Sequence, residues 1–334
     1  MTITAQTMIH SLLPHLDPKN AQGYGEAPVN IALSKYWGKR QLDLNLPTNS
    51  SLSISLPGLG TQTRLAIQQA PNDQAWLNGE RLAPESVFAQ RLSRYLDFFR
   101  PPGLVFDIHT ENTVPTAAGL ASSASGYAAL VLALNDLFGW QLDSRSLSIL
   151  ARIGSGSASR SLFPGFAIWH RGEREDGLDS FAEALPQTWP ELCIGLVKVD
   201  VQQKAVSSTQ GMQQTVNTCD LYQAWPQQAE RQVKIIRQAI EDKNFTQLGE
   251  TAEHNALSMH ATMIATWPPI VYWQPQSVAA MQTVWQLRQQ GVEVYFTMDA
   301  GPNLKLLFLA DNKKAVETAF KGIQIIQGPS INPK

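Results

Sequence analysis

A run of small residues from Pro115 to Gly126 constrains the fold of this chain more than any other segment. It reads Pro-Thr-Ala-Ala-Gly-Leu-Ala-Ser-Ser-Ala-Ser-Gly, and apolar residues then recur at helical spacing as far as Gly139. A helix that starts after such a turn presents unpaired backbone N–H groups and a positive dipole, which suit a phosphate. A tight turn with a serine cap is the plainer interpretation. The length of the run, and side chains too small to obstruct a polyphosphate, favour a phosphate-binding loop.

This loop fits neither of two well-known phosphate motifs. Gly126 is followed by Tyr127 rather than by the Lys and Ser/Thr of a P-loop, and the dinucleotide fingerprint needs a closer glycine pair than Gly119 and Gly126 provide. The order of its residues instead resembles the central loop P-x-x-x-G-L-x-S-S of the GHMP kinases, named after galactokinase, homoserine kinase, mevalonate kinase and phosphomevalonate kinase. The matching residues are Pro115, Gly119, Leu120, Ser122 and Ser123.

Composition narrows the classes of partner. The chain has 334 residues, of which 43% are hydrophobic and 16% charged, and its formal net charge is −2. This is enough apolar material for one large domain or two closely packed ones. Because the net charge is near zero, no overall basic field favours nucleic acid or an anionic membrane, and any anion site has to be local.

Cysteine content and the N-terminal segment indicate the compartment. Only two cysteines occur, Cys193 and Cys219, which argues against a disulfide framework and fits a reducing cytosol. Cys193 lies in the apolar run 192–199, so we expect a buried thiol. His10 and Pro14 interrupt the N-terminal segment, so we find no signal peptide, and no run approaches the roughly 20 apolar residues of a membrane helix. We therefore expect a cytoplasmic protein that binds neither membranes nor nucleic acid.

Hydrophobic spacing predicts strands and helices in both halves of the chain, which indicates an α+β protein of two α/β lobes. A composition shift near residues 186–191 separates the halves. We expect a loosely held extension over 1–24, an N-terminal lobe with the phosphate loop over 25–188, and a C-terminal lobe over 189–334. Expected strands are 26–33, 51–57, 104–110, 192–200, 292–298 and 304–309, with a hairpin tip at 76–80; expected helices are 86–99, 143–153, 226–242, 244–260, 276–290 and 311–320.

A basic and aromatic segment follows the first predicted strand. Lys35 and Lys39 flank Tyr36, Trp37 and Gly38. The plainer interpretation is a strand end with solvated lysines, since lysine is mostly exposed. The alternative is that the two lysines bind a phosphate to which Tyr36 donates its hydroxyl.

Three more polar segments are candidates. Arg160 ends a Gly/Ser-rich segment that begins at Gly154, and its guanidinium suits a carboxylate or phosphate, although such loops are common. Ser207 to Met212 reads as a hydroxyl-rich turn. Asp299 stands at a predicted strand end before Ala-Gly-Pro-Asn, where it is either a catalytic carboxylate or an ordinary turn initiator.

Taken together, these segments resemble the diphosphomevalonate decarboxylases, a family within the GHMP kinase superfamily. The resemblance extends from about residue 26 to about residue 320. It implies the GHMP kinase fold, with the active site in the cleft between the lobes. The matching segments are 35–39 (Lys-Tyr-Trp-Gly-Lys), 115–126, 154–161, 207–212, 259–262 and 299–303.

The resemblance also implies roles for individual residues. The catalytic residues would be Asp299, Lys35 and Arg160, with Asp299 accepting or orienting a hydroxyl proton. Mg²⁺ would be held with the nucleotide phosphates, and no side chain is assigned as a metal ligand. Substrate-binding residues would be Tyr36, Lys39, Ser155, Ser157, Arg160, Ser208 and Met212, and nucleotide-binding residues would be Ala118, Gly119, Leu120, Ala121, Ser122, Ser123 and Ser125.

The implied reaction is ATP-dependent decarboxylation of mevalonate 5-diphosphate. Transient phosphorylation of the 3-hydroxyl would precede loss of phosphate and carbon dioxide, giving isopentenyl diphosphate and ADP. We expect ATP and Mg²⁺ as cofactors and a homodimer. The alternatives are a kinase acting on mevalonate or its 5-phosphate, a decarboxylase of the 5-phosphate, and a non-catalytic protein that binds isoprenoid intermediates.

Overall fold

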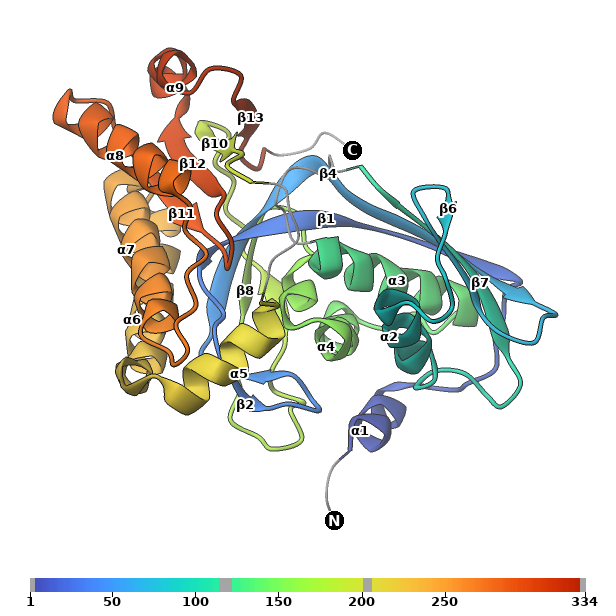
Figure 1. Ribbon diagram of the computed structural model, residues 1–334. Coiled ribbons are helices and arrows are strands. Elements are labelled where there is room, and N and C mark those ends of the chain that lie inside the picture. Colours follow the sequence, from blue (N-terminus) through green and yellow to red (C-terminus); the bar gives the residue numbers. More distant parts are fainter. Residues whose placement is uncertain (1–3, 114–121, 201–205, 331–334) are drawn as a thin grey trace.

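Two β-sheets organise the chain (Figure 1). The structure is a computed structural model and describes residues 4–113, 122–200 and 206–330, without the side chain of Ser122. The first sheet has seven strands in these residues, in the order β6-β5-β7-β4-β8-β9, with β1 paired to β4. Only β5 and β7 pair in parallel. The strands are β1 (Gln22–Ser34), β4 (Ser51–Gln68), β5 (Gln74–Leu77), β6 (Glu80–Arg81), β7 (Val105–Asn112), β8 (Phe166–Trp169) and β9 (Ala182–Ala184).

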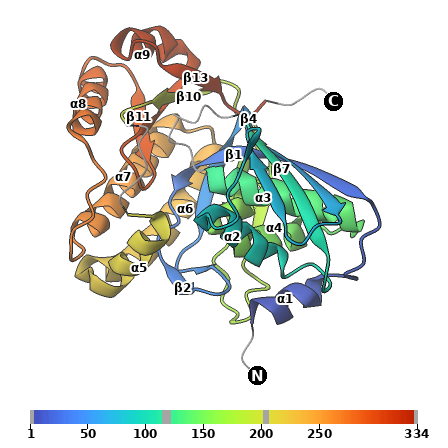
Figure 2. The same cartoon turned by 45° about the vertical axis from the view of Figure 1, so that its right-hand side comes forward.

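The helices of the N-terminal lobe lie on one side of the first sheet (Figures 1 and 2). Among them α3 packs along β1 and β4, and glycines on β1 permit this close approach. A Cβ atom added at Gly23 or Gly25 would lie 2.1 Å from a backbone carbonyl oxygen of α3, so any side chain there would push the helix away. The helices are α1 (Ala5–Leu12), α2 (Val87–Leu96), α3 (Ser122–Phe138) and α4 (Ser144–Gly154).

The second sheet is antiparallel, in the order β11-β12-β10-β13, and helices pack against it. The remaining short elements include the ribbon β2–β3 and three 3₁₀ helices. The elements are β10 (Leu192–Val197), β11 (Val294–Met298), β12 (Leu304–Leu309), β13 (Gln324–Gln327), α5 (Ser208–Thr218), α6 (Trp225–Glu241), α7 (Phe245–Ile264), α8 (Pro275–Gln289), α9 (Lys313–Ala319), β2 (Lys39–Gln41), β3 (Leu46–Pro47), η1 (Gly156–Arg160), η2 (Asp220–Ala224) and η3 (Ala310–Asn312).

One hydrophobic core joins the two lobes. The second half of β1 and the first half of β4 pack with β10, α6 and α7 in a single buried cluster, whose members include Ile31, Ile54, Ile194, Ile236 and Leu248. The long strands β1 and β4 therefore belong to the N-terminal lobe along one half and pack on the C-terminal lobe along the other. This shared core fixes the two lobes relative to each other, so side chains from both can meet in one site.

The structure differs from the sequence-based expectation at the N-terminus, at residues 207–212 and in several short elements. The N-terminal segment is not loosely held throughout, because Met8 and Ile9 bury one face of α1 in the core of the N-terminal lobe. The segment 207–212 is not a turn: Ser207 caps α5, which runs on to Thr218. The 3₁₀ helix η1 and the strands β2, β3, β8, β9 and β13 were not expected, since short elements leave little periodicity to detect. In the described part of the chain, no helix combines the length and apolar character that crossing a membrane requires.

Candidate active site

Asp299 lies at the turn between β11 and β12, where its carboxylate is held by two lysines. The Nζ atom of Lys35 is 2.9 Å from Oδ1, and that of Lys305 is 3.0 Å from Oδ2. Both lysine side chains are 2% exposed, whereas that of Asp299 is 31% exposed. Lys35 comes from the end of β1 and also donates to the carbonyl oxygen of Ala32 at 2.7 Å. The N-terminal lobe thus supplies one lysine, and the C-terminal lobe supplies the carboxylate and the other lysine.

The electrostatics of this group keep the carboxylate ionised. Burial alone would raise the pKa of Asp299, but attraction and hydrogen bonds from Lys305 and Lys35 outweigh it and hold that pKa well below its usual range. Burial lowers the pKa of the Lys35 ammonium to about 8, although Asp299 opposes this shift. Lys305 and Arg160 repel the charged form of Lys35 and add to the lowering.

Arg160, on η1, is a buried cation with unused hydrogen-bonding capacity. Its side chain is among the most buried of the large side chains, and burial lowers its pKa to about 10, so it stays charged at neutral pH. Its Nη1 donates to the hydroxyl of Ser51 and its Nη2 lies 3.5 Å from Oδ1 of Asn30. Its Nε is buried and has no partner among the described residues. A buried donor without an acceptor is costly, so this atom is suited to an anionic ligand.

Tyr36 lies beside Arg160 and also has an unpaired donor. Its hydroxyl is buried with no hydrogen-bond partner among the residues that the structure describes. Its ring packs edge-on against Trp169, with the ring centres 4.8 Å apart. A Cβ atom at Gly156 would lie 2.7 Å from that ring, so the glycine leaves room for it. The Gly/Ser segment of η1 is thus shaped around Tyr36.

Lys39 places a further cation on the β2–β3 ribbon. Its Nζ is 2.5 Å from Oδ1 of Asn45, whose amide donates to the carbonyl oxygens of Arg152 and Ile153 at the end of α4. Burial lowers the pKa of Lys39, and the charge of Arg91 adds to this. Helix α5 also contacts β2 of this ribbon. Lys35, Lys305 and Arg160 act on the one carboxylate of Asp299, and Lys39 adds a cation on the ribbon, an arrangement that favours a ligand with several negative charges.

Two protein-family models match this chain over most of its length. Residues 27–182 match the family model described as the diphosphomevalonate decarboxylase-like N-terminal domain, and residues 194–327 match the mevalonate 5-diphosphate decarboxylase C-terminal domain. The diphosphomevalonate decarboxylase of Saccharomyces cerevisiae is 39% identical over 311 residues, which cover 86% of this chain and 78% of the relative. The chain belongs to the diphosphomevalonate decarboxylase family.

Solved structures of this family share the fold. The mevalonate diphosphate decarboxylase of Staphylococcus aureus superposes with a TM-score of 0.87 at 39% identity, covering 93% of this chain and 96% of that one. A solved complex with MVAPP, AMPPCP and magnesium superposes with a TM-score of 0.87 at 40% identity, covering 92% and 97%. The predicted α+β architecture of two lobes with the GHMP kinase fold is therefore confirmed.

The structure brings the three residues expected to be catalytic together between the lobes. Asp299 and Lys35 are in contact, and Arg160 is close enough for its charge to act on both. Their convergence agrees with the family resemblance, although each comes from a different segment of the chain. The catalytic roles themselves are proposals.

The residues expected to bind substrate occupy different environments. Ser155 and Ser157 lie half-buried at η1 with their hydroxyl oxygens 3.4 Å apart, near Tyr36 and Arg160. Ser208 is the first residue of α5 and is half-buried. Met212 is 7% exposed and packs in an apolar cluster of the C-terminal lobe together with Trp37. Ser155, Ser157 and Ser208 carry hydroxyls of a kind that suits phosphate oxygens, whereas the side chain of Met212 is buried in that apolar cluster.

The nucleotide-binding prediction is only partly within the described residues. Ala118, Gly119, Leu120 and Ala121 lie outside them, and α3 begins at Ser122. Ser123 is exposed on the first turn of α3. Ser125 is fully buried, with its hydroxyl oxygen 2.7 Å from that of Thr61, so its side chain faces the sheet.

A small apolar cavity lies beside the first turns of α3. Ser123, Gly126 and Tyr127 line it from α3, and Phe88 and Leu92 line it from α2. The cavity therefore borders the N-terminal turns of the helix that carries the serines of the nucleotide-binding prediction.

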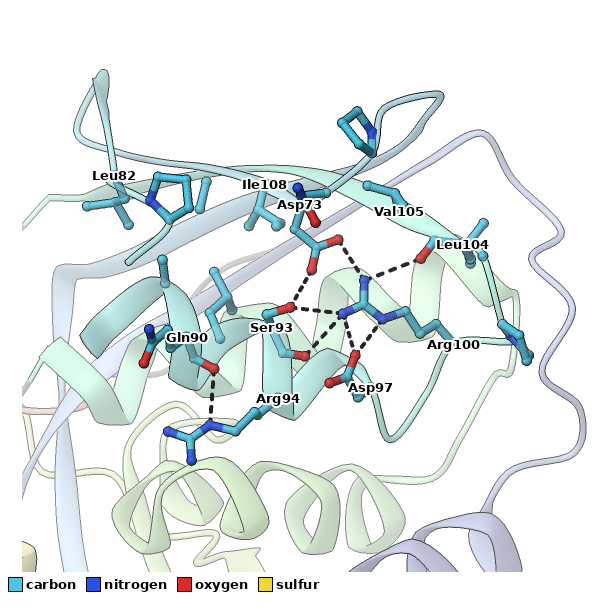
Figure 3. Close-up of a pocket in the computed structure, with 18 of the residues that line it drawn as sticks. Asp73, Leu82, Gln90, Ser93, Arg94, Asp97, Arg100, Leu104, Val105 and Ile108 are labelled. Carbon is cyan, nitrogen blue, oxygen red and sulfur yellow. Dashed lines mark hydrogen bonds and ion pairs between the residues drawn. The ribbon is translucent and has the colours of Figure 1, made fainter. Parts of the chain in front are cut away.

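A wider groove of about 940 Å³ lies elsewhere in the N-terminal lobe, between α2 and the sheet (Figure 3). Of its four ionised side chains, Asp73, Asp97 and Arg100 are paired with one another, and Arg94 donates to the carbonyl oxygen of Gln90. Arg100 forms ion pairs with Asp73 and Asp97 and also bonds to Ser93, as the dashed lines in Figure 3 show. Because these charges are already neutralised, the groove offers a polyanion much less than the Asp299 site does.

Sequence reasoning missed Lys305 as a member of the site. It is a lone cation within the apolar strand Leu304–Leu309, and a charged residue in a buried strand needs a partner. That signal was available in the sequence. Asn30 and Ser51, which bond to Arg160, gave no comparable signal, because small polar residues are common in strands.

Proposed function

We propose that this protein converts mevalonate 5-diphosphate and ATP into isopentenyl diphosphate, ADP, phosphate and carbon dioxide, with Mg²⁺. Family relatives are named for this decarboxylation, and a solved relative binds MVAPP, AMPPCP and magnesium. In this chain, the observation that carries the proposal is the single carboxylate of Asp299, held between two buried lysines beside the buried guanidinium of Arg160.

In the first step, Asp299 would act on the 3-hydroxyl of the substrate. Its carboxylate accepts the hydrogen bond of the hydroxyl and orients the oxygen toward the terminal phosphorus of ATP. A carboxylate with so low a pKa is a weak base, so it receives the proton only as the new oxygen–phosphorus bond forms. Lys35 neutralises charge on the transferring group, and bound magnesium supplies further neutralisation at the nucleotide phosphates.

In the second step, the new phosphate leaves C3 with the electron pair of the carbon–oxygen bond. The bond from C2 to the carboxylate then breaks, its electrons form the carbon–carbon double bond, and carbon dioxide departs. Asp299 passes the proton to the departing phosphate and, ionised again, stabilises the positive charge that grows at C3. Arg160 holds the carboxylate in its guanidinium fork, which aligns the breaking bond.

The diphosphate would lie along the basic surface formed by β2 and η1. Tyr36 offers its unpaired hydroxyl, Lys39 its ammonium, and Ser155 and Ser157 their hydroxyls. Ser208 at the start of α5 approaches from the other lobe, since α5 contacts β2. Donors from separate segments exceed what one phosphate group requires, which favours a diphosphate over a monophosphate.

A substrate comparison tests this function. The protein is incubated with ATP, Mg²⁺ and each of mevalonate, its 5-phosphate and its 5-diphosphate, while ADP and carbon dioxide are measured together. We expect equal amounts of both products, mainly from the 5-diphosphate. ADP without carbon dioxide would indicate a kinase, and a comparable kcat/KM with the 5-phosphate would indicate a monophosphate decarboxylase. Binding without either product would indicate a non-catalytic binding protein.

Replacing Ser123 with alanine tests which end of the site binds the nucleotide. Because the loss of one neutral hydrogen bond typically costs about 0.5–1.5 kcal/mol, we expect the KM for ATP to rise about two- to tenfold. The KM for the diphosphate substrate should stay the same, since Ser123 lines the cavity between α2 and α3, whose lining includes no residue of β2 or η1. Steady-state kinetics with each substrate varied in turn measures both values. A rise in the KM for the diphosphate alone would reverse our assignment of the two ends.

Other expectations from the sequence stay predictions. These are the homodimer, the cytoplasmic location and the boundary between lobes at residues 188 and 189. The last strand of the first sheet ends at Ala184 and the first strand of the second sheet begins at Leu192, which is compatible with that boundary.

A further inference from the structure

Lys305 is a buried cation to which the reaction outlined above gives no role. It lies on β12, in the middle of the second sheet, with its side chain 2% exposed. Its neighbours on the strand, Leu304 and Leu306, are completely buried. Placing a charged lysine in such surroundings costs desolvation energy, which the ion pair with Asp299 has to offset. A hydrophobic residue at this position would stabilise the strand without that cost, so the buried ammonium of Lys305 indicates a role in the site.

We propose that Lys305 is a positioning residue that acts through Asp299. Together with Lys35 it clamps both carboxylate oxygens, so that the carboxylate stays ionised and keeps one fixed plane toward the substrate hydroxyl. Lys35 is itself fixed, because it also donates to the carbonyl oxygen of Ala32. A carboxylate has about four lone-pair sites, so the clamp leaves acceptor sites on the exposed side of Asp299. This inference rests on the proposed function and deepens the role given there to Asp299.

Among the residues that the structure describes, four charged or titratable side chains face Asp299 from the elements packed around it. They are Lys35 from β1, Lys305 from β12, Arg160 from η1 and His260 from α7, whose Nε2 is 3.0 Å from the carbonyl oxygen of Asp299. Burial lowers the pKa of His260 to about 3, so the imidazole is neutral in the working range of pH. Arg160 stays charged there. The groups left to change charge are Asp299 on the acid side and Lys35 on the alkaline side.

The position of the pH–rate profile therefore reports the charge of Lys305. If Lys305 loses its charge, the carboxyl of Asp299 loses an attracting cation, so its pKa rises. The ammonium of Lys35 loses a repelling cation, so its pKa rises too. The alkaline limb of the profile, which follows the ammonium of Lys35, consequently moves to higher pH. A merely structural role for Lys305 would lower the maximum rate and leave both limbs in place.

The test is the pH dependence of kcat/KM for the 5-diphosphate with the variant Lys305→Met, which keeps the length of the side chain and removes the charge. We expect the alkaline limb to move up by about one pH unit, as is typical for a close charge. Lys305→Arg keeps the charge and should keep the limbs in place. The matched control is Lys313→Met on α9, whose side chain is 54% exposed, and its profile should equal that of the parent protein.

A double-mutant cycle gives an independent readout. In the Asp299→Asn background, Lys305→Met should lower the residual rate by less than twofold, because a residue that acts through Asp299 has nothing left to act on. If Lys305→Met does not fold, Lys305→Gln removes the same charge and is measured in the same way. Limbs that coincide with those of the parent protein would overturn the inference while leaving the proposed function intact. A parent protein that releases no carbon dioxide from the 5-diphosphate would instead overturn the proposed function.

Discussion

Replacing Asp299 with asparagine should lower kcat for carbon dioxide release by about three orders of magnitude or more. The substitution is nearly isosteric but removes the negative charge. In the proposed reaction, that charge orients the hydroxyl during phosphoryl transfer and stabilises positive charge at C3 afterwards. Both steps therefore lose stabilisation of their transition states.

The measurement that resolves this variant is single-turnover formation of ADP and of carbon dioxide. We expect both products to disappear together. Normal formation of ADP without carbon dioxide would show that Asp299 acts only after phosphorylation, and persistence of both would place the catalytic carboxylate elsewhere.

The structure changes one part of this expectation. From the sequence, Asp299 in a structural role would only have initiated a turn, which asparagine can do equally well. In the fold, it is also the counter-ion of the buried Lys35 and Lys305. Asparagine leaves those two cations without a negative partner, so we expect a lower melting temperature as well. Circular dichroism shows whether the variant folds, and a binding measurement shows whether it still binds the diphosphate substrate.

Replacing Arg160 with lysine should lower kcat by about 100-fold or more. Lysine keeps the positive charge but lacks the planar guanidinium fork. With that fork, Arg160 binds Ser51 and Asn30 through its two Nη atoms while its Nε stays available to a ligand. One ammonium cannot make these bonds and also hold the carboxylate of the substrate, so the carbon–carbon bond that breaks would no longer be aligned. Steady-state release of carbon dioxide measures this effect.

A matched control separates this effect from a general intolerance of the substitution. Arg237 on α6 forms an exposed ion pair with Glu241, and Arg237→Lys should leave kcat unchanged. If folded Arg160→Lys turns over at nearly the normal rate, Arg160 has only a structural role, and the alignment of the carboxylate depends on other residues.

Sequence patterns already determined much of the fold, because periodicity is a local property. The helices α3, α4, α6 and α7 each carry a long apolar face, and their observed bounds lie within a few residues of those expected. Asn78-Gly79 predicted a hairpin tip, and both residues take positive φ there, between β5 and β6. Cys193 is a buried thiol, as its apolar strand predicted.

Family resemblance, rather than periodicity, determined the candidate site. Lys35, Arg160 and Asp299 stand in three separate segments, and no local pattern relates them to one another. Their motifs resemble those of one family, and the tertiary structure then shows that they converge. These residues could be predicted from the sequence because each lies within a short motif, and a motif can be recognised without knowing which residues lie near it in space.

Only the tertiary structure decided which groups complete the site. Lys35 and Asp299 lie 264 positions apart, and the pairing of β11 with β12 brings Lys305 to the second carboxylate oxygen. Strand periodicity identifies a buried position, but it cannot show which charge from another strand will lie opposite it. The pKa values of Asp299 and Lys35 depend on those neighbours and on burial, both of which arise when the two lobes pack on the shared core. The sequence by itself therefore determined the elements and the motifs, whereas packing between distant segments determined their charges and their geometry.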